Sequence, residues 1–177
     1  MMQTEFEVRI LDIDKEKIVS KLKELNADFI GEFFQKRYVY DIVPPKKDAF
    51  LRLRDNGKSS TLTYKQRKGR GIDSTKEIEI EVSSFNQTKD LLQKIGYEPI
   101  TYQENKRSSF ELQGVQIELD KWPLIPLFIE VEGSSKQEVE KIVKLLGYKM
   151  EETTSMSILE VYKKYGIDLH DYDVLKF

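Results

Sequence analysis

The sequence has no cysteine, a single histidine and a single tryptophan among its 177 residues, and it lacks any long apolar run. The absence of cysteine excludes disulfides, thiolate catalysis and cysteine metal sites, and it fits a cytoplasmic protein. With His170 alone, neither a zinc site nor a Ser-His-Asp triad is expected. No segment approaches the length of a membrane span, and the first residues lack the basic and apolar regions of a signal peptide.

Charge is abundant but nearly balanced, with 29 Lys and Arg residues against 31 Asp and Glu residues and a net charge of −2. This balance argues against a general nucleic-acid binder, which needs a positive field. At this length the chain is expected to form one domain over residues 1–177, with a C-terminal helix and tail from about residue 155. A charged fraction of 34% predicts either a heavily charged surface or a charged interior cavity.

Three strand-like stretches carry carboxylates two residues apart, and each precedes an amphipathic helix. They are Glu5-Phe-Glu7 before a helix near 14–26, Glu77-Ile-Glu79-Ile-Glu81 before one near 85–95, and Glu130-Val-Glu132 before one near 135–146. Side chains at i and i+2 of a strand share a face. One such pair alone is typical of a solvated strand face. Three of them indicate a curved sheet with helices outside and acidic side chains pointing into an interior cavity.

Basic pairs follow the same spacing on a predicted hairpin that turns at Asn56-Gly57. Arg52 and Arg54 share a face of one strand, and Lys65 shares a face of the other strand with a further arginine. Arginine presents a planar fork suited to phosphate oxygens, whereas Mg²⁺ and Mn²⁺ prefer carboxylate oxygens. Cross-strand salt bridges on an exposed sheet are the alternative. Acids and bases in one cavity would suit a metal-bound polyphosphate.

The remaining pattern predicts an α+β fold, rich in antiparallel strands, with about eight strands and four helices. Further strands are expected near 3–11, 29–42, 76–82, 100–112, 115–121 and 127–132. A short helix near 155–165 and a tail from Gly166 to Phe177 complete the chain.

Seven fragments resemble, in the same order, the motifs of the CYTH family, the triphosphate tunnel metalloenzymes. They are Glu5-x-Glu7-x-Arg9, Leu51-Arg-Leu-Arg54, Leu62-Thr-Tyr-Lys65, Glu77-Ile-Glu79, Arg107-Ser-Ser-Phe110, Leu119-Asp120 and Phe128-Ile-Glu130-Val-Glu132-Gly133. The resemblance implies an eight-stranded antiparallel β tunnel, closed like a barrel, with helices packed outside. It also implies that the tunnel holds a small-molecule triphosphate with Mg²⁺ or Mn²⁺.

The resemblance assigns roles to individual positions. The catalytic candidates are Glu5, Glu7 and Arg9; the phosphate-binding candidates are Arg52, Arg54, Lys65 and Arg107; the metal-ligand candidates are Glu5, Glu7, Asp120, Glu130 and Glu132. Among these acids, Glu130 is expected to be repelled by like charges, so that its replacement by glutamine would leave folding intact or improve it.

Four positions depart from the family pattern. Arg9 replaces a lysine and keeps its charge but does not readily lose a proton. Asn105 replaces a lysine, while Arg37 and Val39 stand where the family often has Asp and Tyr. Triphosphate binding tolerates these changes better than full catalytic competence does.

Three functions are consistent with these residues. The first is a metal-dependent hydrolase acting on inorganic tripolyphosphate, a nucleoside triphosphate or thiamine triphosphate. The alternative is a class IV-type adenylyl cyclase that converts ATP to cyclic AMP and pyrophosphate. The third is a non-catalytic protein that binds polyphosphate or nucleotide. None of them calls for a nucleic-acid or membrane partner, and the sequence carries no signal for the oligomeric state.

Overall fold

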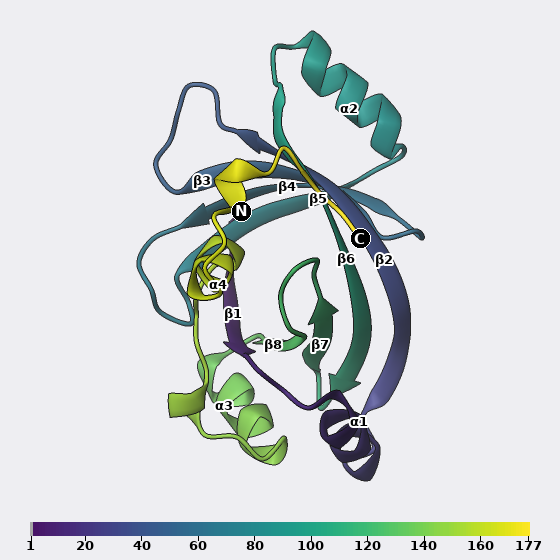
Figure 1. Ribbon diagram of the computed structural model, residues 1–177, viewed down its shortest axis with the longest axis vertical. Helices are drawn as coiled ribbons and strands as arrows, with labels where there is room; N and C mark the ends of the chain where they lie inside the picture. Colours follow the sequence, from purple (N-terminus) through teal and green to yellow (C-terminus); the bar gives the residue numbers. More distant parts are fainter. Residues whose placement is uncertain (1) are drawn as a thin grey trace.

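Eight antiparallel strands pair in a closed ring in the computed structural model, which describes residues 2–177 (Figure 1). Their order around the ring is β2-β3-β4-β5-β1-β8-β7-β6, and the pairing of β6 with β2 closes it. The eight strands are β1 Gln3–Ile10, β2 Asp28–Asp41, β3 Ala49–Asp55, β4 Ser60–Arg67, β5 Thr75–Val82, β6 Pro99–Leu112, β7 Val115–Lys121 and β8 Phe128–Gly133. The predicted α+β tunnel fold is confirmed.

A ninth strand, β9 Val174–Leu175, lies in the segment where the sequence predicted only a tail. It pairs in parallel with β6 at Tyr102 and Gln103. A two-residue strand is too short to show an alternating pattern, so it could not be predicted from the sequence. The short helical turn η2 Leu169–Asp171 precedes it, and another such turn, η1 Met150–Glu152, follows the third helix.

Four α-helices lie outside the barrel wall or at its rim within residues 2–177 (Figure 1). They are α1 Lys15–Glu24, α2 Phe85–Lys94, α3 Lys136–Leu145 and α4 Ile158–Lys164, and their N-caps are Asp14, Ser84, Ser135 and Ser157. Each capping side chain accepts hydrogen bonds from amide groups of the first turn that have no partner within the helix. None of the helices in this part of the chain has the length and apolarity needed to cross a membrane.

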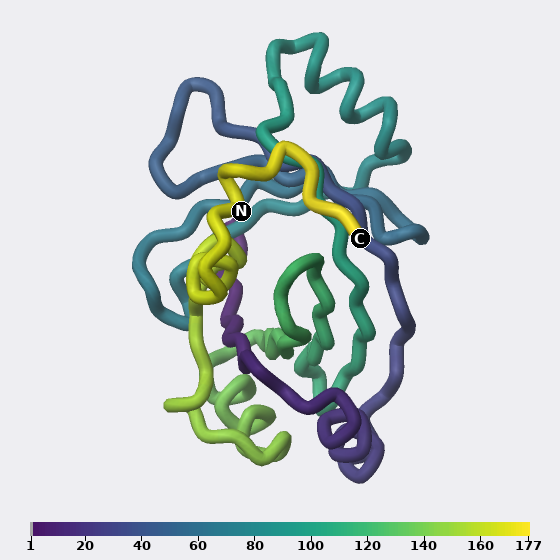
Figure 2. Tube along the Cα trace, viewed as in Figure 1, coloured from purple at the N-terminus to yellow at the C-terminus, as the bar shows by residue number. Residues whose placement is uncertain are grey.

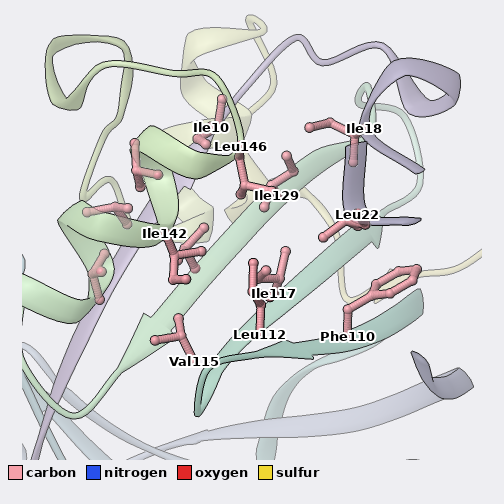
Figure 3. Packing of buried hydrophobic residues seen from close by; sticks show 14 of the residues in the cluster. Ile10, Ile18, Leu22, Phe110, Leu112, Val115, Ile117, Ile129, Ile142 and Leu146 are labelled. Atoms are coloured by element: carbon pink, nitrogen blue, oxygen red, sulfur yellow. The ribbon is translucent and has the colours of Figure 1, made fainter. Parts of the chain in front are cut away.

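The largest apolar core lies between the barrel wall and helices α1 and α3 (Figure 3). Val8 and Ile10 of β1 alternate with the acidic positions of that strand, and Ile129 of β8 does the same. These side chains pack against Leu22 of α1 and Ile142 of α3, all of them almost fully buried. Burying an aliphatic side chain of this size stabilises the fold by roughly 1.5–3 kcal/mol. Because the apolar faces of β1 and β8 point outward to these helices, their polar faces point into the barrel.

The C-terminal segment lies across one end of the barrel (Figure 2). Thr154 pairs with Arg9 at the end of β1, and the backbone oxygen of Ser155 accepts a hydrogen bond from Arg67 at the end of β4. An apolar cluster then forms between α4, the tail and the ends of β7 and β8; it contains Trp122, Ile125, Phe128, Val161, Tyr162, Leu169 and Leu175. Phe128 is opposite Asp120 in the strand register, so it faces the inside of the barrel. The cluster therefore packs against this end of the barrel.

Candidate functional site inside the barrel

Strand register brings the acidic and basic positions together on the inner face. Arg9 lies opposite Glu130, and Glu7 lies opposite Glu132, across the β1–β8 pair. Arg107 lies opposite Asp120 across the β6–β7 pair. All the site candidates chosen from the sequence point into the same barrel, although more than 100 residues separate some partners. The acidic and basic strand faces therefore meet in one interior, as the sequence pattern predicted.

Arg52 and Arg54 of β3 both point inward. The register of β3 with β2 and with β4 runs without interruption, so no bulge turns either arginine outward. Both guanidinium groups contact the same carboxylate oxygen, Oε2 of Glu79, at 3.4 Å. Burial would raise the pKa of Glu79, but a 2.6 Å hydrogen bond from Thr63 and the two arginines lower it overall. Two cations therefore share a single acidic partner on this wall.

Lys65 of β4 forms ion pairs with carboxylates of two other strands. Its Nζ lies 2.6 Å from Oε1 of Glu5 on β1 and 3.2 Å from Oε2 of Glu77 on β5. Burial raises the pKa of Glu5, with the charge of Lys65 acting in the opposite direction and that of Glu77 adding to the rise. The ammonium group is thus positioned between carboxylates that repel each other.

Glu130 lies between two guanidinium groups. Its Oε1 is 2.6 Å from Nη2 of Arg9, and its Oε2 is 2.6 Å from Nη2 of Arg107. Arg107 also forms a bidentate pair with Asp120, with Nε 2.8 Å from Oδ1. Burial opposes ionisation, yet Arg9 and Arg107 hold the pKa of Glu130 far below its ordinary value. The expectation that repulsion dominates at Glu130 is wrong, because sequence pattern does not show which cations face it.

Glu132, two residues further along β8, has the opposite environment. Within residues 2–177 its carboxylate makes no ion pair or hydrogen bond with another side chain. Burial, together with the charges of Glu5 and Glu7, raises the pKa of Glu132 to about 7. Burial also raises the pKa of Glu7, although Arg9 lies 2.7 Å from it. Negative charge is therefore incompletely compensated around Glu5, Glu7 and Glu132.

The acids of the barrel interior differ in how well they suit a divalent cation. Among residues 2–177, no three carboxylate, imidazole or thiolate groups converge on one point as metal ligands do. The chemistry of Glu5, Glu7 and Glu132 nevertheless fits Mg²⁺ or Mn²⁺, because they are hard oxygen donors whose raised pKa values reflect burial and mutual repulsion. Asp120 and Glu130 fit less well, since both are neutralised by guanidinium groups.

Several further residues of the inner face received no binding or catalytic role from the sequence. Thr63 of β4 donates to Glu79, and Glu118 of β7 lies 3.9 Å from Arg107. Arg37 of β2 is buried and donates to Gln35 and to Asn105. Alternation along β2 was the available signal, but aromatic side chains on its outer face obscured which face was internal.

Comparison with known proteins places this architecture in a family. A family model described as the CYTH domain matches residues 3–158. A protein of Methanocaldococcus jannaschii, provisionally named adenylate cyclase MJ0240, is 25% identical over 170 residues, covering 89% of this chain and 97% of that protein.

Solved structures share the fold. A conserved hypothetical protein from Pyrococcus furiosus has a TM-score of 0.76 at 23% identity, covering 89% of this chain and 99% of the other. A provisionally named adenylyl cyclase from Hippeastrum, whose structure is described as revealing a dominant triphosphatase activity, has a TM-score of 0.60 at 16% identity, covering 97% of this chain and 100% of the other. Since the family model spans most of its length, this chain belongs to the CYTH domain family.

Proposed function

We propose that this protein is a metal-dependent hydrolase of a triphosphate substrate bound inside the barrel. The observation that carries this proposal is the pairing of Arg52 and Arg54 with one shared carboxylate, Glu79. Two guanidinium groups against one carboxylate give this part of the inner face more positive than negative charge. It lies inside the barrel, opposite the acids of β1 and β8. A chain of phosphates supplies the missing negative charge, and guanidinium groups match its oxygens.

The basic side chains would bind and stabilise the phosphates. Arg52, Arg54, Lys65 and Arg107 donate toward phosphate oxygens and neutralise the charge that develops during transfer. Their fixed positions on strands supply this stabilisation without reorganisation at the moment of reaction. Arg107 is in turn oriented by Asp120 and Glu130.

The acidic side chains would hold the cation and receive the proton. Glu5, Glu7 and Glu132 would bind Mg²⁺ or Mn²⁺, which, when bound, supplies Lewis-acid neutralisation of phosphate oxygens. Arg9 is unsuited to act as a base: although burial opposes it, the charges of Glu7 and Glu130 raise the pKa of the guanidinium above its ordinary value. We therefore assign Arg9 to charge stabilisation and to positioning of Glu7 and Glu130. The proton of the attacking water passes to a carboxylate.

Adenylyl cyclase activity is the second candidate. The same basic wall would hold ATP, and the ribose 3′-hydroxyl would attack the innermost phosphorus in place of water. The name of the Methanocaldococcus jannaschii relative supports this candidate, while the activity described for the Hippeastrum protein supports hydrolysis. A non-catalytic binding protein is the third candidate, because Arg9 and Asn105 depart from the family pattern.

Product analysis separates the three candidates. We expect the protein, incubated with ATP or tripolyphosphate and Mg²⁺ or Mn²⁺, to release inorganic phosphate, with ADP formed from ATP. A variant carrying both Arg52→Ala and Arg54→Ala serves as the control for contaminating phosphatases and is expected to be inactive. Cyclic AMP and pyrophosphate would instead establish the cyclase, and binding without any product would establish the non-catalytic role.

A further inference from the structure

One edge of β5 lacks a partner strand over the second half of its length. On one side, β5 pairs with β4 from Thr75 to Val82. On the other side, β1 pairs only with Thr75, Lys76 and Glu77. Within residues 2–177 no strand lies beside Ile78–Val82 on that side. The seam between β1 and β5 is therefore joined along only part of β5, and it stays open toward one rim of the barrel.

The backbone of this open edge is available for pairing. In an antiparallel sheet, successive residues direct their amide and carbonyl groups alternately to the two neighbouring strands. Some backbone groups of Ile78–Val82 therefore point away from β4, and no turn or loop of the described chain hydrogen-bonds to them. Proteins often block such an edge with proline, lysine or a bulge. This segment has no proline or lysine, and its register with β4 is uninterrupted.

The two faces of the segment differ in character. Ile78 and Ile80 point outward and are 45% and 54% exposed. Glu79 and Glu81 point inward, and Glu79 is paired with arginines of β3. Glu81 is exposed at the rim and makes no ion pair or side-chain hydrogen bond within residues 2–177. A strand added here would place aliphatic side chains beside the isoleucines, and a positive charge opposite Glu81 would stabilise it.

A second copy of this chain does not meet that requirement. Antiparallel pairing of two β5 edges that keeps the isoleucines on one face sets Glu79 opposite Glu81 or opposite itself. Like charges directly opposite each other are destabilising. A register shifted by one residue would instead direct isoleucines toward the charged interior of the barrel. The inward glutamates therefore oppose self-pairing, while they leave the edge open to a strand that carries positive charge.

We propose that the free edge of β5 binds an extended segment of a partner protein in which aliphatic residues alternate with lysine or arginine. The segment runs antiparallel to β5, as β1 does, and lies beside Ile78–Val82. Its aliphatic side chains pack against Ile78 and Ile80 on the outer face, and a basic side chain on the inner face pairs with Glu81. Main-chain hydrogen bonds supply the affinity, and these side chains supply the selectivity. This binding does not depend on triphosphate hydrolysis.

Amide hydrogen exchange and an NMR titration of the wild-type protein test the pairing without any substitution. The probe is the capped peptide Val-Lys-Val-Lys-Val-Lys-Val. One control peptide has the same composition with valines and lysines in separate blocks, and another has glutamate in place of lysine. We expect the probe to slow hydrogen exchange of backbone amides within Ile78–Val82, because strand addition occupies them. Neither control peptide should protect these amides.

Glu81→Lys tests the charge that selects the partner. Affinity for the lysine peptide should fall about 3- to 10-fold, and the glutamate peptide should gain affinity by a similar factor, because the cross-strand pair is reversed. Glu151→Lys makes the same change on an exposed glutamate of η1 and is the matched control. Ile80→Ser should weaken both peptides on their matching proteins. Ile95→Ser, on a side chain of α2's end that is 62% exposed, should weaken neither.

Each outcome decides the matter. If the lysine peptide does not bind, or binds without protecting amides of Ile78–Val82, the strand-addition proposal is overturned. Equal binding of the block peptide overturns it as well, because general charge attraction would then explain the affinity. An unchanged preference in Glu81→Lys shows that this carboxylate does not select the partner and contradicts the proposal. If Glu81→Lys does not fold, the comparison of lysine and glutamate peptides on the wild type still gives the answer.

Discussion

Replacing Glu130 with glutamine is expected to destabilise the protein by on the order of 3 kcal/mol, although the side chain keeps its shape. Glu130 bridges Arg9 and Arg107 inside the barrel, and the replacement would leave both guanidinium groups with less compensating charge. Activity should also collapse, because Arg107 would lose a partner that holds it in place. Added metal is not expected to restore it.

Glu132→Gln is the matched control, since it makes the same chemical change two residues away on β8. Here removal of the charge should stabilise the protein, by on the order of 2 kcal/mol at pH 8 without divalent metal, because the repelled carboxylate is gone. The folded-state pKa of Glu132 is raised from 4.5 to about 7, so the folded protein binds the proton more tightly than the unfolded chain does. Its contribution therefore disfavours folding increasingly as the pH rises through that window.

Urea denaturation in the presence of a chelator measures both effects. At pH 8 the free energy of unfolding should rank Glu132→Gln above wild type and wild type above Glu130→Gln. At pH 4.5 the advantage of Glu132→Gln should shrink. Mg²⁺ should stabilise the wild type more than Glu132→Gln if this carboxylate is a ligand. A Glu130→Gln protein as stable as the wild type would show that the two-arginine bridge does not hold in solution.

Removing Arg52 and Arg54 together should abolish measurable tripolyphosphate binding. Each arginine contributes about 1.5–3 kcal/mol through charge-assisted hydrogen bonds, equivalent to roughly 10- to 100-fold in affinity. Because both contact Glu79, their effects are not expected to add simply. The fold should persist, since their loss also relieves repulsion of Arg37.

Calorimetry on both single alanine variants and the double variant checks this expectation. Arg70→Ala, on an exposed side chain, controls for the change in net charge. Both single variants should bind more weakly than wild type, because the uninterrupted register directs both side chains inward. If the double variant bound tripolyphosphate normally, β3 would have no part in the site.

Alternation along strands made the barrel and much of its lining predictable. Glu5, Glu7 and Arg9 occupy every second position of β1, and the helical periodicity after them identified the covered outer face. Two periodicities, one for strand and one for helix, thus agreed on which side was internal.

The alternating pattern could not show which side chains face one another inside the barrel. Period two assigns a residue to a face but does not say which strand lies beside it, and so Glu130 was expected to face acids when it lies between Arg9 and Arg107. Arg37 gave little signal because β2 carries polar or aromatic residues on both faces. The pairing of β9 with β6 depends on a fold formed by residues far away in the sequence.

If the barrel interior holds a triphosphate beside a divalent cation, a crystal structure with a non-hydrolysable triphosphate analogue and Mn²⁺ will show both in place. We expect phosphate oxygens within hydrogen-bonding distance of Arg52 and Arg54, and an anomalous Mn²⁺ peak beside Glu5, Glu7 and Glu132. An analogue bound outside the barrel, with no manganese near these three carboxylates, would contradict it.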